Sequence, residues 1–207
     1  MELWNEIITD RSWQLLQKLK NSIDFVLIGG WAVYLSTKAI KSTDVDIIID
    51  FNTLSKLKEF GIRKNDKLKK YEIEVEGVDI DVYAPYYSKF ILPIEEIMKE
   101  TVTVEGFKIP RPEILLLLKQ QAEMNRKNVV KGQKDRIDIL SLIIKTNIDM
   151  KFLKNLFEKY DAQELRARLL TIIKESSEEY NYVFQQKIIP SKLKKIKADL
   201  FEKFRLI

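Results

Sequence analysis

The chain has 207 residues, of which 45% are hydrophobic, and this is enough for one large globular domain or two small ones. It contains no cysteine and no histidine, which excludes disulfides, Cys/His zinc sites and nucleophilic machinery built on Ser–His or Cys–His pairs. Chemistry in this protein must therefore rely on carboxylates, Lys, Tyr, Ser, Thr or a bound hard cation. The net charge of +5 is unevenly spread, because residues 1–100 hold 14 basic and 17 acidic side chains and the rest hold 22 and 14.

No stretch of the sequence approaches the ~18 consecutive apolar residues that a membrane span requires. The longest apolar run, Ile114 to Leu118, is bracketed by Glu113 and Lys119. The first six residues lack a basic segment followed by an apolar one, so we expect no secretory signal and a cytoplasmic location.

The first part of the chain predicts a small α/β domain. Apolar residues at helical spacing predict a helix over 11–21, and a short buried strand over 25–28 follows and ends at Gly29-Gly30. The other elements expected here are a helix at 31–37, a strand at 44–50, a helix at 54–60 closed by Gly61, a hairpin of strands 71–76 and 78–84, and an edge hairpin over 101–109.

From residue 110 the pattern becomes helical. Pro112 suits a first helical turn, and the helix that it begins is expected to reach Arg126 and to be followed by a loop at 128–132. Further helices are predicted at 133–146, 150–160, 162–179 and 191–205, with Asp149 and Ser191 as N-caps. We therefore predict an α+β fold, with a small mixed-sheet domain over residues 1–109 and an α-helical bundle over 110–207.

Two of the predicted strands carry paired aspartates. Asp44 and Asp46 are two residues apart and so share one face of their strand, and Asp79 and Asp81 repeat this spacing. Like charges side by side on a partly buried sheet are costly, and a divalent cation relieves that cost. Because only oxygen ligands are available, the pattern favours Mg²⁺.

Gly29 and Gly30 lie where a strand meets a helix. Residues without a Cβ allow a phosphate to approach the backbone closely, and the N-terminus of the following helix offers free N–H groups. A Gly-Gly turn alone is weak evidence, and its value lies in its short distance from Asp44.

Three segments together carry a resemblance: residues 28–33 (IGGWAV), 41–47 (KSTDVDI) and 78–82 (VDIDV). They resemble the polymerase-β-like nucleotidyltransferase superfamily, whose pattern is Gly-Gly or Gly-Ser, a short helix, Asp-x-Asp/Glu and a third acid on a later strand. Residues 109–119, then Arg126, then 134–139 (KDRIDI) are similar to the abortive-infection toxin branch, which is also related to some aminoglycoside nucleotidyltransferases. The resemblance spans roughly residues 24–143.

The resemblance implies a set of site residues. The expected metal ligands are Asp44, Asp46 and Asp81, with Asp79 as the alternative third ligand, and they imply two Mg²⁺ ions. The expected nucleotide-binding residues are Gly29, Gly30, Lys41, Ser42 and Lys119. Asp135 is expected to orient Lys119 or to act as a base. Trp31 and Lys41 depart from the family, which often has Ser and Arg at these positions.

The implied reaction is attack of an acceptor hydroxyl on the α-phosphate of an NTP such as ATP, with release of pyrophosphate. The toxin branch implies an acceptor on RNA (tRNA) or protein, and an antitoxin partner. The basic second part mildly supports RNA, although the sequence shows no aromatic–basic element typical of RNA recognition. The alternatives are a small-molecule acceptor of the aminoglycoside type and a non-catalytic member that binds a nucleotide or a partner.

Overall fold

The computed structural model describes residues 6–57 and 61–207. The chain forms two compact units, Met1–Arg111 and Pro112–Ile207. In the described part, no helix is long and apolar enough to cross a membrane.

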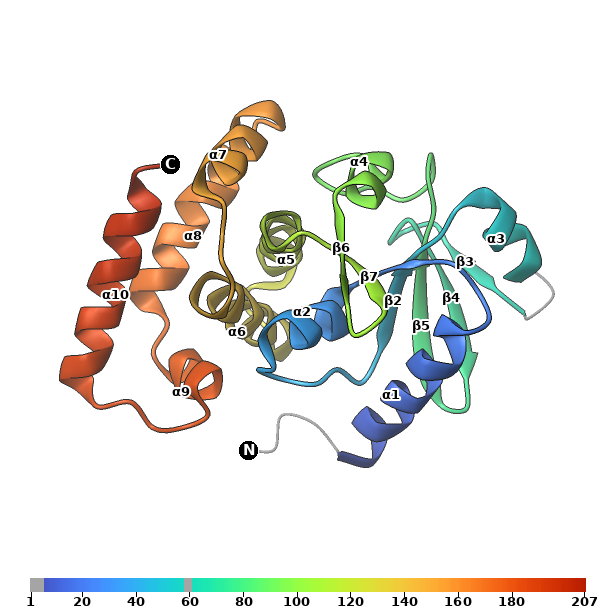
Figure 1. Cartoon of the computed structure of the whole chain (residues 1–207), viewed down its shortest axis with the longest axis horizontal. Coiled ribbons are helices and arrows are strands. Elements are labelled where there is room, and N and C mark those ends of the chain that lie inside the picture. Colours follow the sequence, from blue (N-terminus) through green and yellow to red (C-terminus); the bar gives the residue numbers. More distant parts are fainter. Residues whose placement is uncertain (1–5, 58–60) are drawn as a thin grey trace. The chain divides into compact units, whose positions relative to one another are not determined.

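The first unit contains a mixed sheet of five strands in the order β1-β2-β5-β4-β3 (Figure 1). The strands are β1 (Val26–Ile28), β2 (Val45–Ile48), β3 (Arg63–Asn65), β4 (Lys70–Val75) and β5 (Val78–Tyr83). Strand β2 runs parallel to β5, and the other neighbours are antiparallel. A separate hairpin pairs β6 (Thr101–Val104) with β7 (Phe107–Pro110).

The described residues of this unit also form the helices α1 (Glu6–Lys20), α2 (Gly29–Thr37), α3 (Phe51–Leu57) and α4 (Ile94–Lys99). Helix α1 packs against β5, and α2 packs against β1 and β2. The indole nitrogen of Trp31 in α2 donates a buried hydrogen bond of 2.7 Å to the Ser12 hydroxyl in α1. This bond satisfies the only polar atom of a large buried ring and fixes the two helices to each other.

The predicted alternation along β5 is confirmed. Val78, Ile80 and Val82 are buried, whereas the residues between them are partly or fully exposed. The β4–β5 hairpin turns at Glu76-Gly77 and the β6–β7 hairpin turns at Glu105-Gly106, and all four of these residues have positive φ. Such turns match the right-handed twist of paired strands, so both predicted hairpins form.

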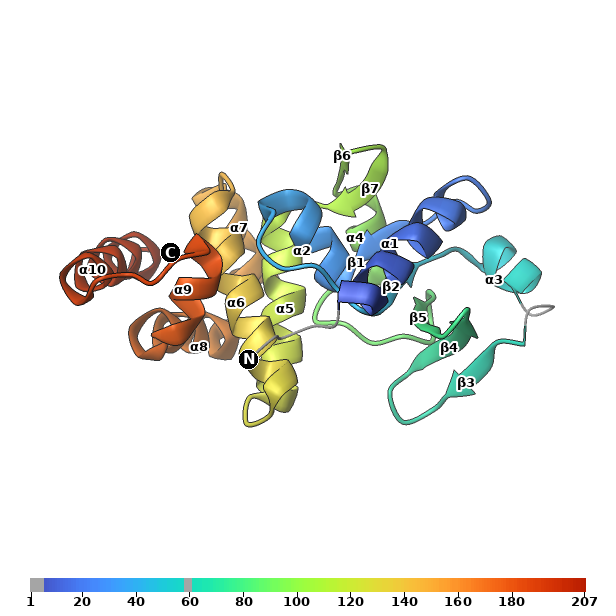
Figure 2. The same ribbon diagram turned by 90° about the horizontal axis from the view of Figure 1, so that it is seen from below.

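The second unit is helical throughout, and the predicted α+β fold class is therefore confirmed. Its helices are α5 (Pro112–Arg126), α6 (Val130–Lys145), α7 (Met150–Lys159), α8 (Gln163–Glu175), α9 (Glu178–Phe184) and α10 (Pro190–Arg205). Helices α5 and α6 lie side by side (Figure 2) and make the most extensive helix–helix packing of the unit. Asp149 caps α7 as predicted, because its carboxylate accepts a hydrogen bond of 3.0 Å from the Phe152 amide.

Several predicted boundaries in the first unit are wrong. Helix α1 begins at Glu6 rather than at residue 11, and α2 includes both glycines rather than following them. Helix α3 begins three residues earlier than predicted, and the predicted end at 58–60 lies outside the described residues. Strand β3 and helix α4 were not expected, because each is very short.

Three predictions for the second unit are also wrong. The expected loop at 128–132 belongs partly to α6, which begins at Val130. The helix predicted over 162–179 is interrupted by Ser176 and Ser177, a residue type that favours helix ends over helix interiors. Ser191 is not an N-cap: Pro190 takes the first turn, where its fixed φ is favourable, and Ile189 is the capping position.

Candidate active site

The strand register brings two of the predicted aspartates together. Asp46 on β2 is the direct partner of Asp81 on the parallel strand β5. Partner residues on neighbouring strands point to the same face, so both carboxylates lie on one side of the sheet. Asp81 is also the partner of Glu72 on β4, and Glu72 is the partner of Arg63 on β3. A row of neighbouring side chains therefore crosses β2, β5, β4 and β3. It consists of three carboxylates and one guanidinium group: Asp46, Asp81, Glu72 and Arg63.

Asp44 lies immediately before β2, and its side chain is held by Ser42. The Ser42 hydroxyl is fully buried and donates a hydrogen bond of 2.7 Å to Oδ1 of Asp44. Burial raises the pKa of the Asp81 carboxyl above its usual value, and the negative charge of Asp44 acts in the same direction. The two carboxylates are therefore within electrostatic reach of each other.

Gly29 is required where it stands, at the start of α2. Its φ is +66°, and a Cβ built on it would lie 2.0 Å from Oδ2 of Asp46. The Asp46 carboxylate thus rests against the Gly29 backbone, beside the N-terminal end of a helix, where negative charge is favoured. Gly30 follows and is buried.

Lys70 is a site residue that the sequence did not reveal. Its Nζ lies 2.6 Å from Oδ2 of Asp81 and 3.2 Å from Oε1 of Glu72. Burial lowers the pKa of Lys70, but the hydrogen bonds to Asp81 and Glu72 and their charges outweigh it, so the net shift is upward and the side chain stays protonated. Within residues 6–57 and 61–207, no three Asp, Glu, His or Cys side chains stand close enough to hold a metal ion.

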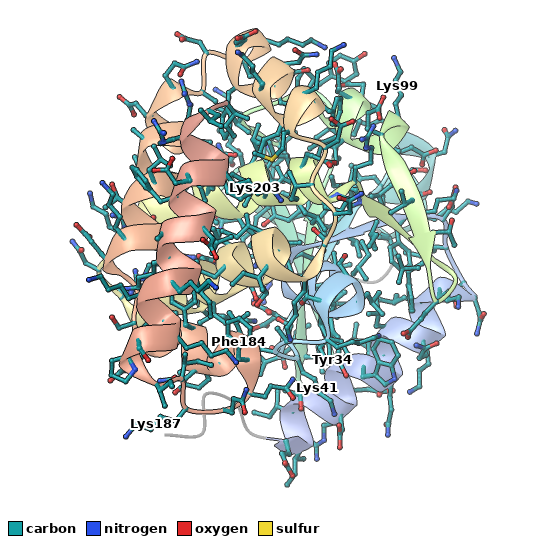
Figure 3. All side chains as sticks on the ribbon, turned by 60° about the vertical axis from the view of Figure 1, so that its left-hand side comes forward. Tyr34, Lys41, Lys99, Phe184, Lys187 and Lys203 are labelled. Carbon is teal, nitrogen blue, oxygen red and sulfur yellow. The ribbon has the colours of Figure 1, made fainter. Side chains whose placement is uncertain are left out.

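Two other predicted residues lie apart from this row. Asp79 is exposed and faces Glu74, two residues away from Asp81 along β5. Lys41 pairs with Asp10 at 3.1 Å, and Figure 3 shows it close to Tyr34. The hydrogen bond from Lys41 to Asp10 is the main cause of its raised pKa.

In the second unit, Lys119 and Asp135 meet inside the packing of α5 against α6. The Lys119 Nζ lies 3.5 Å from Oδ1 of Asp135 and 2.7 Å from Oδ2 of Asp138. Arg126 donates two hydrogen bonds to Asp135, one of 2.7 Å from Nε to Oδ2 and one of 3.0 Å from Nη2 to Oδ1. Both aspartate side chains are fully buried and that of Lys119 is 8% exposed, so this is an internal ion cluster.

Asp138 belongs to the 134–139 segment, but no role was predicted for it. Burial raises the pKa of its carboxyl, and the charges of Lys119 and Lys134 offset this only in part. Its position three residues after Asp135 on one helix places both on the same face, which is the signal that could have identified it.

A comparable signal existed for Lys70. The two-residue turn at Glu76-Gly77 fixes the register of β4 against β5 and hence the row in which each side chain lies. Lysine on a surface strand is usually solvated, so the sequence alone does not distinguish Lys70 from its neighbours.

No protein-family model matches the chain, and no curated protein matches it. Among solved structures, the chain is similar to an antigenic nucleotidyltransferase-like protein from Paracoccidioides brasiliensis, with 20% identity, coverage of 89% of this chain and 95% of that one, and a TM-score of 0.48. It is also similar to JHP933 from Helicobacter pylori, with 18% identity, coverage of 98% and 92%, and a TM-score of 0.49. Neither similarity bears on the abortive-infection branch, which stays a prediction.

Proposed function

We propose that the protein is a Mg²⁺-dependent nucleotidyltransferase that transfers NMP from an NTP to an acceptor hydroxyl. The observation that carries the proposal is the pairing of Asp46 with Asp81 on parallel strands. Asp44 lies within electrostatic reach of Asp81, and the Gly29 backbone supports the Asp46 carboxylate.

The chemistry of the donors fits magnesium, although no three carboxylates of the described residues stand close enough to hold an ion by themselves. Mg²⁺ is usually bound by one or two carboxylates together with substrate phosphates and waters. Asp44, Asp46 and Asp81 offer only carboxylate oxygens, which Mg²⁺ prefers, and we propose that they hold two ions. When bound, Mg²⁺ would stabilise the charge on the attacking and leaving oxygens. The register supports Asp81 over Asp79 as the third ligand, because only Asp81 lies beside Asp46.

The chain's own residues have separate roles in this proposal. Ser42 holds Asp44 in one orientation, and the N–H groups at the start of α2, beside Gly29 and Gly30, donate hydrogen bonds to phosphate oxygens of the NTP. The acceptor oxygen forms a bond to the α-phosphorus, the bond to the bridging oxygen breaks, and pyrophosphate leaves. We propose that Asp81 takes the acceptor proton, because its carboxylate lies beside Asp46 in the site.

Lys119 is proposed as a phosphate contact, and Asp135 as the group that positions it. Both oxygens of Asp135 already accept hydrogen bonds from Arg126, and the side chain is fully buried. These contacts favour the positioning role over the alternative in which Asp135 is the base.

For the acceptor, we propose RNA such as tRNA, or protein, with an antitoxin as a further partner. The excess of basic residues beyond residue 100 favours a polyanion and disfavours a polycationic aminoglycoside. The non-catalytic alternative predicts metal-dependent NTP binding without transfer to any acceptor.

The test is transfer of label from α-³²P-NTPs to cell extract by wild type and by the Asp44→Ala/Asp46→Ala double variant, with circular dichroism to confirm folding. We expect label from the wild type only, and sensitivity of the labelled product to ribonuclease or protease identifies the acceptor. Equal labelling by the double variant would exclude the proposed mechanism.

A further inference from the structure

Lys70 lies on the same face of the sheet as the carboxylates of Asp46, Asp81 and Glu72. It is two residues before Glu72 on β4, and Glu72 is the partner of Asp81. The side chains of Lys70 and Asp81 are only 13% and 18% exposed, and their atoms Nζ and Oδ2 are 2.6 Å apart. At this separation, and with little solvent between them, the pair interacts far more strongly than a surface ion pair.

A divalent cation on Asp81 would stand beside this ammonium group. Two positive charges that share one carboxylate repel each other, so the cation must displace the Lys70 ammonium or bind more weakly. Lysine is a compact charge on a flexible stem with several donors. Glu72, whose Oε1 is 3.2 Å from the Lys70 Nζ, offers a second partner to which that ammonium can move.

We propose that Lys70 is an internal counter-ion that competes with the divalent cation for Asp81 and thereby sets the metal affinity of the site. Glu72 keeps the ammonium paired when it leaves Asp81. The proposal rests on the assignment of Asp81 as a metal ligand in the proposed function.

Lys69 provides a matched control. It carries the same charge at the adjacent position, but its ammonium lies over the Tyr87 ring, 5.5 Å from the ring centroid. A change of Lys69 alters the net charge of the protein equally and leaves the Lys70–Asp81 pair in place.

The experiment measures Mn²⁺ binding to the full-length protein by electron paramagnetic resonance, without nucleotide. Lys70→Met keeps the apolar stem and removes the charge, so we expect binding tighter by about tenfold. Lys69→Met should bind as the wild type does, and Lys70→Arg, which keeps the charge beside Asp81, should bind no more tightly than the wild type. The double variant Lys70→Met/Asp81→Asn should lose the gain, because the gain requires the freed Asp81 carboxylate.

Three results would overturn the competition: unchanged or weaker binding in Lys70→Met, an equal gain in Lys69→Met, or a gain that survives Asp81→Asn. The metal site itself is tested separately by Asp44→Ala/Asp46→Ala. If that variant loses Mn²⁺ while Lys70→Met equals wild type, only the competition fails. If neither wild type nor Lys70→Met binds Mn²⁺, the metal site fails as well.

A second pair of variants serves if Lys70→Met does not fold. Glu72→Gln removes the second partner, so Lys70 rests on Asp81 alone and Mn²⁺ binding should weaken. Glu74→Gln makes the same change two residues along β4, opposite Asp79, and should weaken binding less. Equal effects of the two variants would contradict the proposal.

Discussion

Asp79 and Asp81 differ in their surroundings although they carry the same charge two residues apart on one strand. Asp81 is half-buried beside Asp46, and Asp79 is exposed beside Glu74. We predict that Asp81→Asn lowers kcat by at least about a hundredfold, a typical loss for a removed general base, and that Asp79→Asn changes it less than about threefold. Steady-state kinetics of NMP transfer measure both, and similar losses would mean that the register does not select the third ligand.

Gly29 has both a positive φ and a close contact with a neighbouring side chain, whereas Gly77 has only the positive φ. Gly29 and Gly77 both have positive φ, but a Cβ would strike the Asp46 carboxylate at Gly29 and would meet nothing within 4 Å at Gly77. Gly77→Ala should therefore cost about 1 kcal/mol of unfolding free energy through backbone strain alone, with activity retained. Gly29→Ala should cost more and should also abolish transfer, because Asp46 must move.

Urea unfolding and the transfer assay together test this comparison. The decisive quantity is activity per folded molecule. Full activity in folded Gly29→Ala protein would show that NMP transfer does not depend on the contact between Gly29 and Asp46.

The helices and strands that the sequence predicts correctly are those that a pattern of a few neighbouring residues determines. The β4–β5 and β6–β7 hairpins follow from apolar alternation around a glycine turn, and α5 follows from Pro112 and a long apolar face. The spacing of Asp44 and Asp46 also predicted a carboxylate pair on one face, although β2 begins at Val45 and Asp44 lies just before it.

The elements that were missed depend on partners far along the chain. Strand β3 has the sequence Arg-Lys-Asn and no apolar alternation, and it forms because β4 offers a free edge. Lys70 could be recognised only once β4 was aligned with β5. Helix α6 begins early, with Val130 exposed, so no apolar periodicity marks its first turn.

A buried ionic network ties four helices of the second unit together. Glu123 of α5 is fully buried and accepts two hydrogen bonds, of 2.9 and 2.6 Å, from Arg168 of α8. Arg136 of α6 bonds Glu123 at 3.3 Å and reaches Glu179 of α9 at 3.1 Å. Removing one member leaves buried charge uncompensated, which is far costlier than the loss of a surface pair.

We therefore predict that Glu123→Gln lowers the unfolding free energy by about 3 kcal/mol. The matched control is Glu202→Gln, which breaks an exposed pair with Arg205 and should change it by less than about 0.5 kcal/mol. Urea unfolding followed by far-UV circular dichroism measures both. Equal effects would show that the buried network contributes no more than a surface ion pair.

At the scale of the whole molecule, each compact unit has its own buried core. Ile47, Ile80 and Val82 are almost fully buried in the first unit, and Leu140 and Leu169 are fully buried in the second. Units with separate cores can unfold separately, because their stabilising contacts are largely internal.

The distribution of tryptophan allows that separation to be measured in the intact chain. The second unit contains no tryptophan, and Trp13 and Trp31 pack against each other in the first unit, so the change in fluorescence on unfolding reports on the first unit. The far-UV ellipticity reports on the helices of both units. Glu123 and the members of its ionic network all lie in the second unit. We predict that Glu123→Gln lowers the urea midpoint of part of the ellipticity change and leaves the fluorescence midpoint where it is in the wild type. An equal shift of both midpoints would mean that the two units unfold as one cooperative structure, because a change in one core would then destabilise the other.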